Sequence, residues 1–391
     1  MRTHGSAATT CPRALTSIGT LLGVMAMLLM LWPPMPARSE SHLIRVGLRR
    51  EVERIVVMSD RSIALSAGTA APVRVGPGAY EFTATPTGVV AAGVGSFDAV
   101  VRLAPADGAR LYLDIYPYRG VLELRRTAAG RLTVINELDL EEYLYGVLKN
   151  EVDPQWPTEA LKAQAVASRT WALYSLNRFA SEGYDVCATA DCQVYRGVTA
   201  EDPRTSAAVD ETRGEVMTYQ GRPIFAAYHS DSGGSTESSE LVWGGAYPYL
   251  RGVADPYSVG APRHEWIVRM DLATFENRVR RSGRMITNVT GIEVAEATPS
   301  GRAALLRVAG AHGVLLLKGA ELRAVLGADL RSTLFTVRLV PDDPPQVEFQ
   351  GRGSGHGVGL SQWGARGMAE MGRRYQEILS YYYSGIAFET K

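Results

Sequence analysis

Glu151 is the acidic residue whose position in the sequence points to chemistry. It lies eleven residues after Leu140, in a segment whose apolar residues recur at helical intervals. At about 100° per residue, eleven steps return to within about 20° of the starting direction, so Glu151 shares the face of Leu140. Glu141 and Lys149 fall on the predicted solvent face. A carboxyl group on an apolar face loses hydration, which raises its pKa and suits it to general acid catalysis. The alternative is a helix-end carboxylate turned into solvent, because Pro154 follows closely.

Two predicted helices position this acid. The first begins at Asp139, which with Glu142 three residues later forms a capping-box-like start. The second begins at Pro157 and continues through a run of good helix formers. Arg169 lies twelve residues past Pro157, a little over three turns along the same predicted helix. We therefore expect Arg169 to face the cleft of Glu151 and to orient an acetamido or carboxylate group, with a surface cation as the alternative.

The rest of the chain divides into segments of different pattern. Residues 44–135 are predicted to be β-rich, and residues 138–260 hold the helices, followed by strands and loops. Residues 265–350 alternate a helical piece with short strands, which predicts a smaller inserted α/β lobe. Residues 351–391 contain a Gly-rich loop and a final helix pair that complete the core of residues 44–264. The predicted fold class is α+β, with a β-rich N-terminal part, a helical catalytic segment and the inserted lobe.

Residues 1–38 carry the pattern of an export signal. Arg2 and Arg13 flank a polar start, and an apolar run follows from Leu15 to Trp32 before several prolines. This run is long enough that an uncleaved membrane anchor is the alternative to a cleaved signal peptide. We therefore expect an extracytoplasmic protein, secreted or anchored by this segment, that meets a membrane only there.

Composition narrows the class of partner. Hydrophobic residues make up 46% of the chain, which is typical of a globular protein. Lysine plus arginine and aspartate plus glutamate both number 41, so the formal net charge is zero. Because nucleic-acid binding normally shows as basic excess or basic clusters, no nucleic-acid partner is expected.

Cys187 and Cys192 are the two cysteines outside the predicted export segment, which contains Cys11. An even pair, five residues apart, in an oxidising compartment favours a local disulfide.

A Gly- and Ser-rich stretch supplies hydroxyl groups beside a histidine. Such a turn suits sugar hydroxyl and acetamido groups, and a tight turn around a core histidine is the alternative. A Ser–His nucleophile pair is disfavoured because no nucleophile-elbow pattern surrounds either serine. The candidate binding residues here are His229, Ser230, Ser232, Gly233, Gly234 and Thr236.

The loop of residues 351–359 has glycine at every second position and no Lys-Ser/Thr ending, so it is not a phosphate-binding P-loop. Alternating glycines let the backbone approach a ligand or another strand closely. Within the loop, His356 is a candidate for contacting substrate, and packing support for the cleft is the alternative.

Several of these segments together resemble the SpoIID/LytB family of sporulation proteins and amidase enhancers. The resemblance keeps the family's order and covers roughly residues 44–388. Any one segment would be a weak signal, whereas the set is specific. The segments are Glu151-Val152 with Trp156 to Thr170, Cys192 to Gly197, Tyr228-His229-Ser230, Ser232-Gly233-Gly234 with Thr236-Glu237, and Gly353 to Gln362.

The resemblance implies a lytic transglycosylase of peptidoglycan, with Glu151 as general acid and base. Arg169 would then bind substrate, and Tyr195 and Gln362 join the candidate binding residues. The products would be 1,6-anhydro-N-acetylmuramic acid ends, and the resemblance also implies a preference for peptide-stripped glycan. The alternative role is a glycan-binding enhancer of a cell-wall amidase that does not itself cut. No cofactor is expected: some relatives hold zinc near these cysteines, but this chain lacks the upstream histidine and zinc usually needs four ligands.

Overall fold

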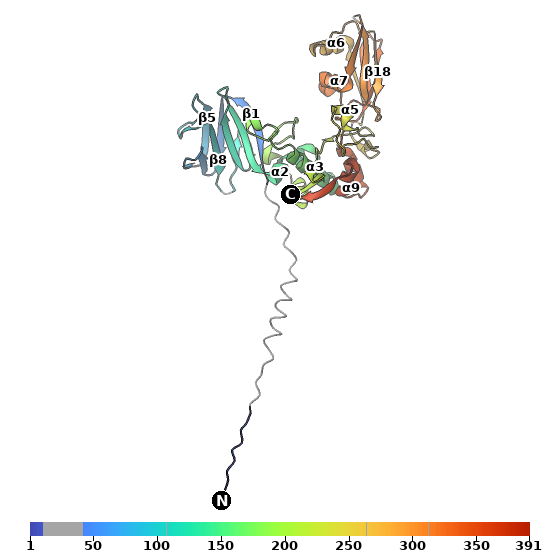
Figure 1. Ribbon diagram of the computed structural model, residues 1–391. Coiled ribbons are helices and arrows are strands. Elements are labelled where there is room, and N and C mark those ends of the chain that lie inside the picture. The colour runs from blue at the N-terminus through green and yellow to red at the C-terminus, as the bar shows by residue number, and fades with distance from the viewer. Residues whose placement is uncertain (11–41, 107, 263, 312) are drawn as a thin grey trace. The chain divides into compact units, whose positions relative to one another are not determined.

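The computed structural model of the protein describes residues 1–10, 42–106, 108–262, 264–311 and 313–391 (Figure 1). Residues 1–40 and residues 41–391 form two separate units. The predicted export segment, including Cys11, falls largely outside the described residues. Within the described part of the chain, no helix is both long and apolar enough to cross a bilayer.

Two sheets make up the β-rich N-terminal part, and alternate residues of their strands are buried in one shared apolar core. The first sheet has the strand order β13 (Val186–Cys187), β1 (Leu43–Val52), β12 (Leu132–Asp139), β11 (Val121–Arg126), β8 (Val100–Pro105), β3 (Ile63–Ser66) and β4 (Val73–Val75). The second has the order β10 (Tyr116–Tyr118), β9 (Leu111–Leu113), β2 (Arg54–Ser59), β5 (Gly78–Ala84), β6 (Val89–Ala91) and β7 (Gly95–Phe97).

The helical segment follows directly from β12. Helix α2 (Leu140–Glu151) begins where the Asp139 carboxylate accepts a hydrogen bond from the Glu141 N–H, at 2.9 Å. The predicted capping partner Glu142 contacts Arg119 instead. Helix α3 (Thr158–Tyr174) is buried almost all round, since α2, α4 (Pro203–Glu211), α8 (Gln362–Glu370) and α9 (Tyr375–Tyr382) pack against it. Its many alanines let these neighbours approach closely.

Residues 265–352 form a lobe with its own apolar core. The chain enters the lobe through β17 (Glu265–Asp271) and leaves through β22 (Gln346–Arg352), and these two strands pair antiparallel. The two ends of the lobe are therefore adjacent. Figure 1 shows α6, α7 and β18 together within it. The other elements are α6 (Leu272–Arg281), β18 (Gly291–Ala297), β19 (Ala303–Gly310), β20 (Gly313–Lys318), α7 (Gly319–Leu326) and β21 (Phe335–Val340).

The C-terminal segment returns to the main core. Strand β23 (Leu360–Ser361) pairs in parallel with β16 (Tyr228–His229), and β24 (Ala387–Thr390) pairs with β14 (Glu215–Tyr219). The predicted α+β class is thereby confirmed. The remaining elements are β15 (Arg222–Pro223), α5 (Ser239–Trp243) and the short 3₁₀ helices at Ala180–Glu182, Gly197–Ala200, Ser258–Gly260 and Gly327–Asp329.

Candidate active site

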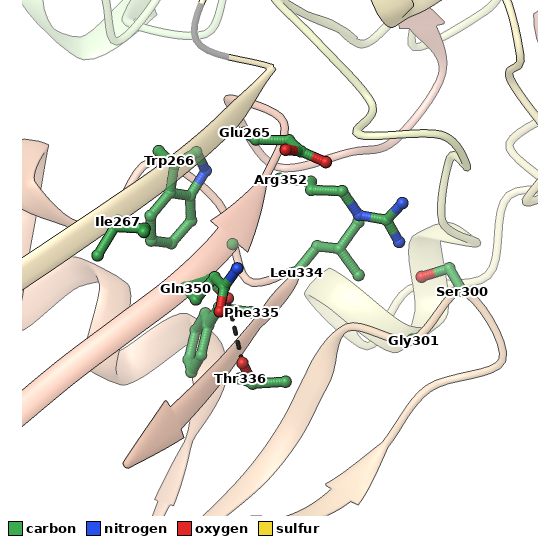
Figure 2. A pocket seen from close by; sticks show the side chains of 11 residues that line it. Glu265, Trp266, Ile267, Ser300, Gly301, Leu334, Phe335, Thr336, Gln350 and Arg352 are labelled. Atoms are coloured by element: carbon green, nitrogen blue, oxygen red, sulfur yellow. Dashed lines mark hydrogen bonds between the residues drawn. The ribbon is translucent and has the colours of Figure 1, made fainter. Parts of the chain in front are cut away.

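Two cavities are candidates for the active site, and the side chains that line them distinguish one from the other. The larger, of about 840 Å³, lies in the lobe, where strands β17, β21 and β22 face the turn at Ser300–Gly301 (Figure 2). The acid on its lining, Glu265, is exposed to solvent. The other cavity, of about 680 Å³, contains Glu151 together with histidine, tryptophan, tyrosine and glutamine side chains. The second cavity is therefore the candidate active site, and we call it the Glu151 cleft.

Glu151 is the last residue of α2 and points into this cleft. Burial raises the pKa of its carboxyl group, and the Val194 N–H, the Tyr228 hydroxyl and the Gln362 amide oppose the rise without cancelling it. The Val194 N–H lies 3.4 Å from Oε1. The partial negative charge at a helix C-terminus also disfavours a carboxylate there. The structure thus places Glu151 in a poorly hydrated cleft rather than in bulk solvent.

A chain of hydrogen bonds fixes the hydroxyl group beside Glu151. The Tyr143 hydroxyl donates to Gln193 Oε1 at 3.1 Å, and Gln193 Nε2 donates to the Tyr228 hydroxyl at 3.2 Å. The Tyr228 oxygen therefore acts as an acceptor in this chain, which leaves its proton for the Glu151 carboxylate. Burial raises the pKa of Tyr228, so that proton stays in place. Tyr228 lies in a segment that resembles the family, but sequence reasoning did not single it out.

The pairing of β16 with β23 brings Gln362 to the same site. Tyr228 aligns with Leu360 and His229 with Ser361, so the first residue of α8 comes next to the Glu151 cleft. Gln362 Nε2 lies 3.4 Å from Gln164 Oε1 on α3, and both side chains are buried. Gln362 thus lines the Glu151 cleft, and the Gln164 contact holds it there, while its role in binding substrate stays a prediction.

The two histidines at the cleft differ in what they offer a ligand. His229 Nδ1 donates to the Val358 carbonyl at 3.1 Å, and its buried Nε2 has no hydrogen-bond partner among the described residues. Burial holds the pKa of His229 well below its usual range, so Nε2 presents a free lone pair. His356 instead accepts the Val358 N–H at Nδ1, at 3.0 Å, and faces the Tyr228 carbonyl. Burial lowers the pKa of His356 to about 4. His229 thus keeps an unpaired acceptor enclosed in the cleft wall, while His356 bonds to the backbone around it.

Trp243 and Asp191 complete the cleft wall. Trp243, at the end of α5, is 43% exposed and its ring centre lies 5.0 Å from that of His356. An exposed indole face of this kind can stack on a sugar ring. Asp191 is a second acid on the lining, with an exposed side chain, and sequence reasoning missed it because it lies in a loop with no periodic pattern.

Arg169 is not at the cleft, and the expectation that it faces Glu151 is wrong. Its guanidinium is 1% exposed and forms a two-point ion pair with Glu141, at 2.8 and 2.6 Å. It also donates to the Val209 and Glu215 carbonyls, both at 3.1 Å. Glu141, expected on the solvent face, is itself buried and accepts the Gly214 N–H. The pair fastens α2 and α3 to the end of α4, which is a structural role.

Tyr195 also lies away from the cleft. Its side chain is buried between Tyr118 and Tyr143, and its hydroxyl donates to Asn136 Oδ1 at 2.8 Å. It lines a separate cavity of about 470 Å³ with residues of β1 and β10. Tyr195 therefore joins α2 to the first sheet, and it does not line the Glu151 cleft.

Within the Gly- and Ser-rich turn, only His229 and Ser230 line the cleft. Ser232 is fully buried and donates to Asp255 at 2.6 Å, and Thr236 bonds to the backbone of Val253. Gly233 has a φ of 75°, and a side chain there would meet the backbone of Arg352. The expected sugar-binding roles of Ser232, Gly233, Gly234 and Thr236 thus find no support in position, because these residues shape the turn.

The lobe is tied to this turn by Arg302. Its side chain is 2% exposed and donates to the carbonyls of Ser232 and Ser235, at 2.7 and 3.1 Å. Burial lowers the pKa of Arg302 to about 10. Gly357 in the alternating-glycine loop makes room for this guanidinium, since a side chain there would collide with it. The glycines of that loop accordingly serve close packing between the lobe and the core.

Cys187 and Cys192 form a disulfide. Strand β13 pairs with β1 at Val46 and Gly47, which holds the loop in place, and Ala190, Asp191 and Cys192 line the Glu151 cleft. His264 bonds to Asp231 at 3.0 Å. Across the described ranges, no three His, Cys, Asp or Glu side chains are grouped to hold a metal ion.

The fold and the cleft define an α+β protein whose candidate cleft carries one half-buried acid with a raised pKa. A family model described as stage II sporulation protein matches residues 128–219, which include Glu151. A second, described as domain of unknown function (DUF8618), matches residues 260–359, the lobe and the glycine loop.

Relatives give the same assignment. Stage II sporulation protein D of Bacillus subtilis is 32% identical over 64% of this chain and 74% of its own length. An uncharacterised protein of Brachyspira hyodysenteriae is 37% identical over 65% of this chain and 68% of its own length. The amidase enhancer of Bacillus subtilis is 32% identical over 63% of this chain, but over only 40% of its own length. This chain belongs to the SpoIID/LytB family, as the sequence resemblance predicted.

Proposed function

We propose that the protein is a lytic transglycosylase that cleaves peptidoglycan between N-acetylmuramic acid and N-acetylglucosamine. The observation that carries this proposal is the position of Glu151, a carboxyl group with a raised pKa in a cavity of about 680 Å³. A cavity of that volume is in the usual range for small-ligand sites, roughly 300–1,000 Å³. A protonated acid beside a bound glycan has the position that general acid catalysis requires.

In this mechanism Glu151 acts first as an acid and then as a base. It donates its proton to the glycosidic oxygen as the bond from C1 of N-acetylmuramic acid breaks. The C6 hydroxyl of the same sugar attacks C1 and returns its proton to Glu151, so no water is consumed and a 1,6-anhydro end forms. Because this nucleophile belongs to the substrate, a second carboxylate at a fixed separation is not needed.

The neighbouring residues support both steps. Once Glu151 has lost its proton, the Tyr228 hydroxyl and the Gln362 amide lie beside the carboxylate and stabilise it. Trp243, which is 43% exposed, would stack on a sugar face. We further propose, on the pattern of residues 1–38, that the protein acts outside the cytoplasm on glycan strands and needs no cofactor.

A second role is favoured by one observation, the similarity to the amidase enhancer of Bacillus subtilis. In that role the cleft would bind glycan without cutting it, and the partner would be a cell-wall amidase. The proton chemistry of Glu151 would then be dispensable.

Product analysis tests the main proposal. We expect the purified protein to release fragments with 1,6-anhydro ends from peptidoglycan or from peptide-stripped glycan, detected by mass spectrometry. Reducing ends would indicate hydrolysis with water as nucleophile, and intact glycan would contradict any cutting activity. Intact glycan combined with faster cleavage by an added amidase would support the enhancer role.

The raised pKa of Glu151 predicts a pH dependence with a definite sign. The protonated acid persists to higher pH than in an ordinary glutamate, so kcat/KM should fall as pH rises through this raised pKa.

Because the folded protein holds this proton more tightly than the unfolded chain, the contribution of Glu151 to stability is full below the unfolded-state pKa and declines up to the folded-state pKa. Urea unfolding across pH should show Glu151→Gln becoming more stable than wild type as pH rises. A stability difference that does not change with pH would contradict this.

A further inference from the structure

We propose that the lobe builds an anion-binding subsite beside the Glu151 cleft, in which Arg323 and Arg331 hold a carboxylate carried by the glycan. The inference rests on the proposed function for the identity of the ligand, and it assigns part of the binding site to the segment described as a domain of unknown function.

The position of a second cavity is the first observation. This cavity, of about 550 Å³, adjoins the Glu151 cleft, and three residues line both: Trp243, Arg323 and His356. Arg331 lines only the second cavity. A glycan bound at Glu151 would therefore extend past Trp243 toward the two arginines. We call this second cavity the arginine subsite.

The charge of the arginine subsite is the second observation. None of its lining residues is acidic. Within the described part of the chain, no carboxylate lies within ion-pair distance of Arg323 or Arg331. The nearby acids are already engaged, because Asp329 pairs with Arg278 at 2.5 Å and Glu321 with Arg284 at 3.2 Å. The subsite thus carries positive charge that the protein does not neutralise.

The burial of Arg323 makes this charge significant. Arg323 is half-buried on α7, where its Nε donates to the Leu330 carbonyl at 3.2 Å. Burial lowers the pKa of Arg323, with no acid to oppose the effect. Arg331 is fixed through its backbone, whose carbonyl accepts the Gly355 N–H at 2.9 Å. A desolvated cation without a counter-ion is unfavourable, and a bound anion relieves that cost.

The form of the subsite indicates a carboxylate. Guanidinium groups bind carboxylates through two parallel N–H donors, a geometry that a lysine does not provide. Other lining residues, Ala320, Ala324 and Ala328, are small and neutral, which leaves room for a substituent. Two sources on peptidoglycan offer this group: the lactyl carboxylate of peptide-free N-acetylmuramic acid, and the carboxylates of an attached stem peptide.

Binding measurements on the full chain test the subsite. The Glu151→Gln background prevents turnover, and calorimetry would compare peptide-free glycan, peptide-bearing glycan and neutral chitotetraose, which lacks any carboxylate. We expect Arg323→Gln to weaken binding of a carboxylate-bearing glycan about tenfold and to leave chitotetraose binding unchanged, since charge-assisted bonds are the stronger class. In Arg323→Gln, the affinity for the carboxylate-bearing glycan should also depend less on salt concentration. Whichever of the two glycans loses affinity identifies the source of the carboxylate.

Matched variants keep the result interpretable. Arg307→Gln removes an exposed arginine of the same lobe, whose partner is Glu293, and should change no affinity. Arg331→Gln should act in the same direction as Arg323→Gln, and Arg323→Lys should recover only part of the loss. The proposal would be wrong if Arg323→Gln weakened chitotetraose binding as much as glycan binding. It would also be wrong if neither Arg323→Gln nor Arg331→Gln weakened glycan binding. Because binding is measured without turnover, a failure to find anhydro products would remove the proposed reaction but not this result.

Discussion

Glu151→Gln is expected to reduce glycan cleavage by about 10²- to 10⁴-fold, the contribution of a positioned general acid. Glutamine has the same shape and can still accept the Val194 N–H, but it has no proton of suitable acidity to give to the glycosidic oxygen. The folded structure should persist, since the substitution removes a carboxyl group whose burial is unfavourable. The measurement is the initial rate of anhydro-end formation, with thermal unfolding to verify the fold.

Asp191→Asn is the matched control, because Asp191 is the other acid on the cleft lining. A mechanism with one acid predicts a small effect, whereas two cooperating carboxylates predict a loss comparable to that of Glu151→Gln. Comparable losses would therefore replace the lytic mechanism with a hydrolytic one. A Glu151→Gln protein that cuts normally would remove Glu151 from catalysis, and one that still stimulates an amidase would favour the enhancer role.

Arg169→Met is expected to destabilise the fold by about 3–5 kcal/mol, because it leaves the buried Glu141 carboxylate without its partner. Glu141→Leu should cost a similar amount, although Glu141 lies nowhere near the cleft lining. The free energy of unfolding in urea measures both. This prediction separates a structural role from the substrate-binding role expected from the sequence, which would lower affinity without a large loss of stability.

The double variant Arg169→Met/Glu141→Leu should recover much of the stability, because a buried ion pair replaced by apolar side chains is often close to neutral. Arg213→Ala provides the control, since it breaks an exposed pair with Asp210 and should change stability by less than about 1 kcal/mol. Normal stability of Arg169→Met with weakened glycan binding would restore the original expectation.

Glu151 and Arg169 together show what helical spacing can and cannot predict. Spacing predicts which residues share a face, and for Glu151 it correctly gave the apolar side of α2, a helix on which only Lys149 is exposed. Twelve steps from Pro157 turn the direction by about 120°. Helix α3 is also covered on almost every side, so spacing does not say which neighbour Arg169 meets. For the same reason the sequence did not predict that Glu141 is buried: the side of α2 that it occupies is covered by the end of α4.

Residues brought together from distant segments were the hardest to predict. Tyr228 and Gln193 meet only through the pairing of β16 with β23 and the folding of the disulfide loop. Arg323 lies on a helix of eight residues with a weak periodic pattern, and its place beside the cleft depends on the folding of the whole lobe. The Ser232 hydroxyl looked available because its partner, Asp255, lies 23 residues further along the chain.

The pairing of β17 with β22 means that the chain leaves the lobe next to the point where it entered. A segment inserted in this way can be lengthened, exchanged or removed without rerouting the rest of the backbone, because a short hairpin would bridge the same gap. The lobe can thus be exchanged as one unit, while Glu151 and the side chains that hydrogen-bond to it stay on the core side of the junction.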